Sequence, residues 1–178
     1  MSSPQVLVLN GGSSSGKSSL ARALQEELAG VWLRLGVDTL LDAAPPRLLG
    51  ADGLELGPDG SVSPGAAFDE AERQWRAGIA AMATAGAHVL AEDNFLGGPV
   101  SQQRWRQALR GLAVGWVGVR CAAEVATARE VARGDRTPGM AALQAVAVHV
   151  GISYDLELDT SRATPEELAR GVRAHWWP

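Results

Sequence analysis

Cysteine, lysine and long apolar runs are scarce in this chain of 178 residues. The scarcity of cysteine argues against a disulfide-bonded protein, and that of apolar runs argues against a membrane-spanning one. Cys121 is the single cysteine, so an internal disulfide is excluded, and its place at the end of an apolar run indicates a small buried side chain. No run approaches the roughly 18 apolar residues that cross a membrane, and the first residues lack signal-peptide features. We therefore expect a cytoplasmic protein with no membrane partner.

Basic residues are too few for a nucleic-acid-binding surface. The net charge is −4, whereas nucleic-acid binding needs a basic field, so nucleic acid is not an expected partner. Of the 16 basic residues, Lys17 is the only lysine and the others are arginines. The length suits a single domain over residues 1–178.

That lone lysine lies in a phosphate-binding motif, G-x-x-x-x-G-K-S. An apolar run, Val6–Leu9, precedes it and a helical pattern follows it, which is the strand–loop–helix context that the motif requires. Glycines let the backbone turn its N–H groups toward phosphate oxygens, and the helix that follows adds its positive dipole end. The residues predicted to hold the nucleotide are Gly11, Gly12, Ser13, Ser14, Ser15, Gly16, Lys17, Ser18 and Ser19.

The chemistry of this motif predicts ATP and Mg²⁺ as cofactors. Lys17 can reach the β- and γ-phosphates, and the hydroxyl of Ser18 can bind Mg²⁺. The alternative is an ordinary glycine-serine linker. Every other basic residue is an arginine, and the only lysine, which carries a compact ammonium group, stands in this motif. This placement argues against a linker.

Five short apolar runs alternate with helical patterns, which predicts an α/β fold: a five-stranded parallel sheet with helices on both faces. The expected strands are Gln5–Asn10, Trp32–Asp38, Ala87–Glu92, Val114–Cys121 and Ser153–Asp159. Among the helices, one stripe of apolar residues runs from Ala66 to Ala85 and includes Trp75. A later helix has its apolar face at Met140, Leu143, Ala147 and Val150.

Residues 42–65 contain several glycines and prolines, which predict a long loop without regular elements. Loops of this length in compact domains are usually functional, so we interpret it as a substrate loop. Leucines in and beside it, Leu41 among them, could wall an apolar acceptor pocket together with Trp75. The alternative is a solvent-facing insertion.

Asp38 closes the second predicted strand, at the sheet edge where ligands bind in such folds. There it could accept the proton of a hydroxyl that attacks the γ-phosphoryl, acting mainly by orienting that hydroxyl. The alternative is a helix N-cap for the residues that follow.

Glu92 and Asp93 end the third predicted strand, where P-loop proteins commonly hold the acid that serves Mg²⁺. The pattern does not decide which of the two faces the metal, and an acidic strand end in solvent is the alternative. Phe95, just beyond, is a candidate contact for the acceptor.

A run of charges from Arg129 to Arg136 forms the second strong signal. Arg133 ends a predicted helix and Arg136 follows in a glycine- and proline-containing turn, which predicts an arginine lid over residues 133–140. Such arginines neutralise charge on a transferring phosphoryl group. The alternative is a solvated charged face.

Together these motifs resemble the chloramphenicol phosphotransferase family of small P-loop kinases. The matching stretches are Gly11–Ser18, Gly36–Asp38, Phe95–Gly98, Trp116–Cys121, Arg133–Arg136 and Tyr154–Thr160. The resemblance implies a fold like that of shikimate and nucleotide kinases. It implies Asp38 as general base, and Arg133 and Arg136 as lid arginines. Lys17 and Ser18 would then be the phosphate and Mg²⁺ contacts.

This sequence departs from the family pattern in two places. Ser15 stands where the family has a small alanine, and Glu92–Asp93 stands where it has two aspartates. The likeness is loosest over residues 42–63, so fold and chemistry carry over more safely than the acceptor.

These observations predict an ATP-dependent kinase that phosphorylates a hydroxyl of chloramphenicol or a related antibiotic and so confers resistance. Asp38, Leu41, Trp75 and Phe95 are the predicted acceptor contacts, which suit a neutral, partly aromatic molecule. The alternatives are a kinase for another small hydroxylated metabolite and a nucleotide-dependent binding module that transfers nothing. Whether the chain forms a homo-oligomer stays open.

Overall fold

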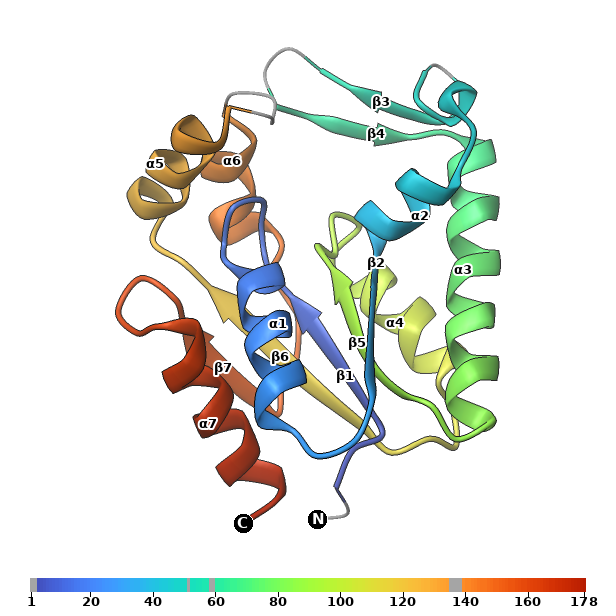
Figure 1. The fold of residues 1–178 in the computed structure, drawn as a ribbon. Helices are drawn as coiled ribbons and strands as arrows, with labels where there is room; N and C mark the ends of the chain where they lie inside the picture. The colour runs from blue at the N-terminus through green and yellow to red at the C-terminus, as the bar shows by residue number, and fades with distance from the viewer. Residues whose placement is uncertain (1–2, 51, 58–59, 135–138) are drawn as a thin grey trace.

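A five-stranded parallel sheet with the strand order β2-β5-β1-β6-β7 forms the centre of the molecule (Figure 1). The structure is a computed structural model that describes residues 3–50, 52–57, 60–134 and 139–178. The strands are β1 (Val6–Asn10), β2 (Trp32–Gly36), β5 (His88–Asp93), β6 (Val114–Arg120) and β7 (Leu156–Asp159). All neighbours in this sheet pair in parallel, so the predicted fold class is confirmed.

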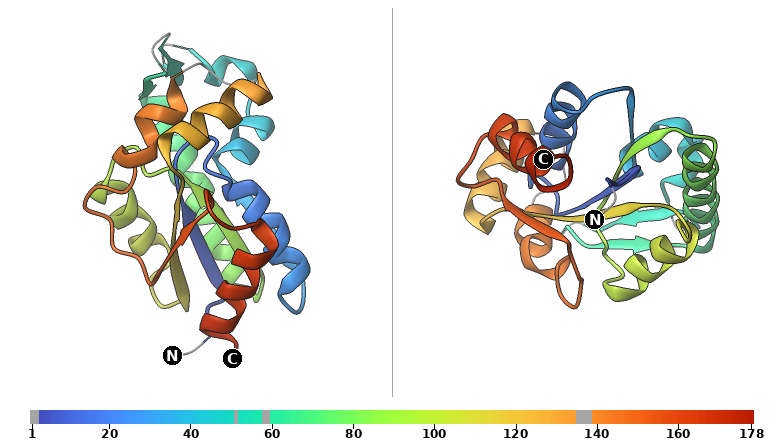
Figure 2. Two further views of the ribbon diagram at one scale, coloured as in Figure 1. Left: turned by 90° about the vertical axis from the view of Figure 1, so that its left-hand side faces the viewer. Right: turned by 90° about the horizontal axis from the view of Figure 1, so that it is seen from below.

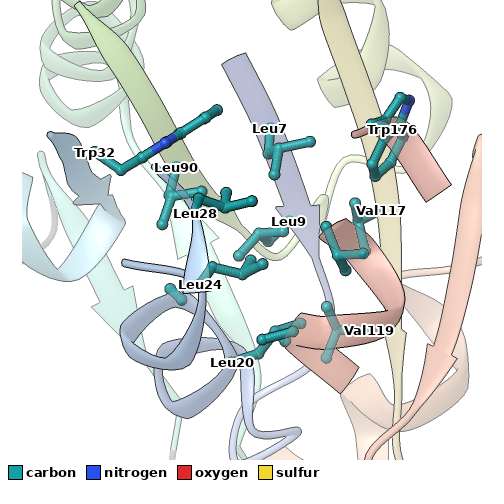
Figure 3. Close-up of a cluster of buried hydrophobic side chains, with 13 residues drawn as sticks. Leu7, Leu9, Leu20, Leu24, Leu28, Trp32, Leu90, Val117, Val119 and Trp176 are labelled. Carbon is teal, nitrogen blue, oxygen red and sulfur yellow. The ribbon is translucent and has the colours of Figure 1, made fainter. Parts of the chain in front are cut away.

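Helices cover both faces of the sheet, as the side view of Figure 2 shows. Helices α1 (Lys17–Glu27) and α7 (Pro165–Trp176) pack on one face, and α3 (Ala66–Thr84) and α4 (Pro99–Ala108) on the other. Strand β1 is buried throughout and alternates between the faces. Leu7 and Leu9 belong to the cluster under α1 and α7, whereas Val6 and Val8 belong to the cluster under α3 and α4. Figure 3 shows the first of these clusters.

Smaller elements surround the carboxyl end of the sheet. They are α2 (Val37–Ala43), the 3₁₀ turn η1 (Pro46–Leu48), the hairpin strands β3 (Leu54–Leu56) and β4 (Val62–Pro64), α5 (Ala123–Arg133) and α6 (Met140–Ala147). The hairpin crosses the top of Figure 1 from the α2–α3 side toward α5 and α6. A Cβ on Gly60 would lie 2.5 Å from the Met140 nitrogen, so the hairpin meets the start of α6.

The prediction of a loop without regular elements over residues 42–65 was wrong. This segment contains the end of α2, the turn η1 and the β3–β4 hairpin. Its apolar residues explain the order, because Leu48 and Leu54 are buried with Leu40 and Phe68 in a small core of their own. Gly50, Gly53, Gly57 and Gly60 lie between these short elements, whereas Pro46 begins η1 and Pro64 ends β4.

The boundary of the second strand also differs from the prediction. Strand β2 ends at Gly36, and α2 begins at Val37 with Gly36 as its N-cap. Asp38 is therefore neither the end of a strand nor the N-cap but lies in the first helical turn. Among the described residues, no helix is both long and apolar enough to cross a membrane.

Candidate active site

A cavity of about 720 Å³ opens at the carboxyl edge of the sheet, and most of the predicted site residues line it. It is lined by the phosphate loop from Gly12 to Ser19, by Asp38 on α2, by Glu92 and Asp93 at the end of β5, and by Arg133 on α5. Arg136 lies outside the described residues. The structure thus brings the predicted phosphate, metal, base and lid residues to one cavity, while their roles stay predictions.

The phosphate loop has the features of an anion cradle. The ammonium of Lys17 donates to the carbonyl oxygens of Gly11 and Gly12, at 2.5 and 2.8 Å. The hydroxyl oxygens of Ser14 and Ser15 are buried and have no hydrogen-bond partner among the described residues. Buried hydroxyls without partners are costly, so these groups fit a loop that closes around phosphate oxygens.

Side chains from three other elements hold the loop in shape. Gln144 of α6 accepts a hydrogen bond from the Ser13 N–H at 2.8 Å. The hydroxyl of Thr160, just after β7, donates to the Ser15 carbonyl at 2.6 Å. Arg129 of α5 in turn donates to the hydroxyl and the carbonyl of Thr160, at 3.1 and 2.8 Å. Helices α5 and α6 are therefore both connected to the loop.

The two acids at the end of β5 point to opposite faces of the sheet. The Ser18 hydroxyl donates to Glu92 at 2.7 Å, which places the Glu92 carboxylate beside the predicted Mg²⁺ contact. The Asp93 carboxylate is buried and accepts hydrogen bonds from the indole of Trp105 and from the N–H groups of Asn94 and Phe95. The alternation of a strand separates the two side chains, and only Glu92 faces Ser18.

Arg34 in β2 belongs to the site, although no sequence pattern singled it out. Its guanidinium lines the cavity and forms an ion pair with Glu92 at 3.2 Å. The side chain of Glu92 is only 10% exposed, so a nearby cation lowers the cost of keeping this carboxylate charged. Since Arg34 lies in an ordinary strand pattern, sequence alone offered no signal for it.

Helix α2 separates the cavity from a second, apolar hollow. Asp38, Thr39 and Asp42 face the large cavity. Leu40 and Ala43 face the hollow of about 410 Å³ between α2 and α3. One short helix thus presents a polar side and an apolar side to different spaces.

The predicted apolar acceptor contacts do not line the large cavity. Trp75 lines the apolar hollow, and Leu41 packs against the small core. Phe95 is 1% exposed, belongs to the cluster under α3 and α4 and does not line the large cavity, so its contact with the acceptor stays a prediction. The chain turns Phe95 inward just after β5, where it fills space beside Trp105.

A buried polar network lies where β1 runs into the phosphate loop. The amide of Asn10 donates to the hydroxyl of Tyr154 at 2.5 Å, and that hydroxyl lies 2.6 Å from Nδ1 of His149. Since the hydroxyl accepts from Asn10, it can donate to His149, which leaves the imidazole proton on Nε2. Burial, with the positive charge of Arg120, lowers the pKa of His149 to about 4. Burial also raises the pKa of Tyr154 to about 12.

The fold and the site define a class before any relative is considered. A parallel sheet, a phosphate loop that leads into α1, and a carboxylate beside its serine form the framework of a P-loop kinase. Solved structures agree in fold. A sugar kinase from Janibacter sp. HTCC2649 has a TM-score of 0.65 at 21% identity, covering 95% of this chain and 92% of its own. A tunicamycin resistance protein from Deinococcus radiodurans has a TM-score of 0.67 at 17% identity, covering 97% and 94%.

The chain belongs to the chloramphenicol phosphotransferase-like family, whose pattern matches residues 4–177. A Mycobacterium tuberculosis protein named "Putative O-phosphotransferase" is 37% identical over 186 residues, covering 93% of this chain and 79% of the relative. The predicted resemblance is therefore confirmed. Family and fold together make this protein a small-molecule O-phosphotransferase, an enzyme of the kinase class.

Proposed function

We propose that the protein transfers the γ-phosphoryl group of ATP to a hydroxyl of chloramphenicol or a related antibiotic. One observation carries this proposal: Lys17, Ser18 and Asp38 line the same cavity. A phosphate cradle and a carboxylate that can hold a hydroxyl are the two parts that phosphoryl transfer to an alcohol requires. We also propose a cytoplasmic location, where ATP is available.

The residues of this chain would divide the work as follows. The loop N–H groups and Lys17 would bind the phosphates, and Ser18 and Glu92 would hold Mg²⁺. When bound, Mg²⁺ would neutralise charge on the phosphate oxygens. Asp38 would orient the acceptor hydroxyl and take its proton late, and Arg133, with Arg136, would balance charge that spreads over the phosphoryl group.

A second candidate, a kinase for a more polar hydroxylated metabolite, is favoured by the lining near Asp38. Thr39, Asp42 and Arg34 border the cavity there, whereas the apolar Leu40 and Trp75 line the other hollow. Polar neighbours suit an acceptor with several hydroxyl groups. The neutral, partly aromatic acceptor predicted from sequence relied on residues that lie away from this lining.

A mass-based assay tests the proposal and separates its two candidates. The protein is incubated with ATP and Mg²⁺ and with either hydroxylated antibiotics or sugar-like polyols, and each acceptor is examined for an added phosphate. Chloramphenicol phosphate supports the first candidate and a polyol phosphate the second. If no acceptor in either panel is modified while ATP binds, phosphoryl transfer by this chain is contradicted for both classes.

Substitution of the base tests the mechanism. In Asp38→Asn the loss of the proton acceptor should lower turnover by about 10²-fold or more with nearly unchanged ATP affinity. Asp52→Asn is the matched control, because Asp52 is exposed and lines neither cavity. Full activity in Asp38→Asn would leave Asp38 with only a structural part in α2.

A further inference from the structure

Helix α6 is fixed at its start by a buried acid from the neighbouring helix. Glu130 of α5 is 3% exposed, and its carboxylate accepts hydrogen bonds from the N–H groups of Gly139 and Ala141 at 2.9 and 2.8 Å. An acid at the N-terminus of a helix satisfies N–H groups that have no partner within the helix. Helices α5 and α6 therefore form one braced unit beside the phosphate loop.

Gln144 projects from this braced helix onto the loop, and its orientation is defined by chemistry. Its side-chain oxygen accepts from the Ser13 N–H at 2.8 Å. Because an N–H group can donate only to the oxygen of an amide, the other end of the Gln144 side chain must be the NH₂ group. That nitrogen, Nε2, is buried and has no hydrogen-bond partner among the residues that the structure describes.

The burial of Gln144 makes this lack of a partner informative. Gln144 is 2% exposed, and a Cβ on Gly12 would lie 3.0 Å from its Cβ atom, so the loop and α6 approach each other closely here. An enclosed amide whose oxygen is satisfied and whose two hydrogens are not implies a missing acceptor. The hydroxyls of Ser14 and Ser15 in the same loop also lack hydrogen-bond partners within the described part of the chain.

Gln144 lies at the end of the loop where a terminal phosphate belongs. It contacts Gly12, whose carbonyl accepts a hydrogen bond from Lys17. In this motif the lysine reaches the β- and γ-phosphates, whereas the loop N–H groups cradle the α- and β-phosphates. Gln144 also lines the large cavity, and it comes from outside the phosphate-binding motif.

We propose that the side-chain amide of Gln144 donates a hydrogen bond to the γ-phosphate of the bound nucleotide and so distinguishes a triphosphate from a diphosphate. This inference rests on the proposed nucleotide-binding function. The oxygen of the same amide keeps the loop in place in both nucleotide states. The Nε2 donor of Gln144 therefore responds to the γ-phosphoryl group, which is the group that the reaction transfers.

Binding measurements on two variants test this inference. Affinities for ADP and for a non-hydrolysable ATP analogue are measured by titration calorimetry in wild type, Gln144→Met and Gln144→Glu. Gln144→Met removes both the amide donor and the oxygen that accepts from the Ser13 N–H, at similar volume. We expect the analogue to lose about ten- to a hundredfold more affinity than ADP, as for a lost charge-assisted bond. ADP has no γ-phosphate, so its affinity can fall only through the weaker support of the loop.

Gln144→Glu gives a second, independent readout. A carboxylate oxygen still accepts from Ser13, but the other oxygen would repel the γ-phosphate, so selectivity against the analogue should exceed that of Gln144→Met. Gln103→Met on the exposed side of α4 is the matched control and should match wild type.

The possible results separate the inference from the function on which it rests. Equal losses for ADP and the analogue, or no loss for either, would overturn the inference and leave Gln144 as a structural support. If wild type bound neither nucleotide, the proposed function would fail instead. If circular dichroism showed that Gln144→Met is unfolded, Gln144→Glu alone would decide, because its shape is nearly that of wild type.

Discussion

The two sides of the large cavity are held in place by different means. The phosphate side consists of the loop Gly11–Ser19 and Glu92, and it grows directly from the central strands β1 and β5. The acceptor side consists of α2, which rests on the small core around Phe68 at the edge of the sheet. The phosphate side is thus attached to the main core of the sheet, whereas the acceptor side rests on the separate small core. The packing of the small core can therefore change while the phosphate side keeps its structure.

The largest expected effect would break the acceptor side alone. Phe68 is 5% exposed, and Phe68→Ala removes the largest side chain of the small core, at a cost of about 3–5 kcal/mol locally. We expect a raised KM for the acceptor with unchanged nucleotide affinity, measured by kinetics and calorimetry. Leu49→Ala, an exposed leucine of the same segment, is the control. A parallel loss of nucleotide affinity would mean that the two sides unfold as one unit.

A paired substitution sharpens the description of the phosphate side. Glu92→Gln should lower turnover about 10- to 100-fold and raise the Mg²⁺ concentration needed, because the carboxylate beside Ser18 loses its charge. Asp93→Asn should instead lower the free energy of unfolding by about 2 kcal/mol, since Asp93 accepts from the indole of Trp105 and from two backbone N–H groups that shape the end of β5. Metal titrations and urea unfolding measure the two effects. If Asp93→Asn changed the Mg²⁺ requirement and Glu92→Gln changed only the stability, the orientation of these two acids would be contradicted.

The network behind the loop predicts a pH dependence of stability. The pKa of His149 is about 4 in the folded protein against 6.5 as its ordinary value. Between these two pH values the unfolded chain therefore binds a proton at His149, whereas the folded protein does not. The free energy of unfolding consequently falls as the pH drops from 6.5 toward 4. The loss of unfolding free energy over this range amounts to roughly 3 kcal/mol.

Unfolding in urea at pH 7.5 and pH 4.5 measures this dependence as the difference between wild type and His149→Gln. The variant should lose less stability than wild type on acidification. The exposed His175, changed to glutamine, serves as control. An identical loss in wild type and His149→Gln would exclude His149 as the cause.

The smallest expected effect concerns the N-terminus of α7, which belongs to neither side of the cavity. It serves as a reference for a change in stability without a change in catalysis. Thr164 caps α7 by accepting from the Glu167 N–H, and Glu167 accepts in return from the Thr164 N–H. Thr164→Ala should lower the free energy of unfolding by about 1 kcal/mol, with catalysis unaffected. Reduced turnover at saturating substrate would show that α7 supports the site more directly than its packing on α1 implies.

Local patterns predicted the phosphate side well, because its geometry follows from adjacent residues. The strand, the glycine-rich loop and α1 are consecutive, so G-x-x-x-x-G-K-S predicted their arrangement. Whether Glu92 or Asp93 faces Ser18 depends on which face of β5 each side chain takes, and this requires the pairing of β5 with β1. Sequence alone therefore left the two acids undecided.

Residues that act through tertiary packing escaped the sequence analysis. The predicted apolar face of the later helix included Leu143 and Val150, yet both are exposed, and the polar Gln144 is buried. The periodicity could not reveal this, because the partner of Gln144 is a loop N–H more than a hundred residues away. A lone amide within an apolar helix was the one available signal.

Helix α2 follows β2 without any linker, and this has a consequence for how acceptor choice can diverge. Insertion of one residue ahead of Asp38 would rotate the helix by about 100° and exchange its polar flank for its apolar flank. Length changes at this junction would therefore abolish transfer, whereas exchanges of side chains on the polar flank other than Asp38 would not. Family members with different acceptors should accordingly differ by substitution along this helix and keep the junction length constant.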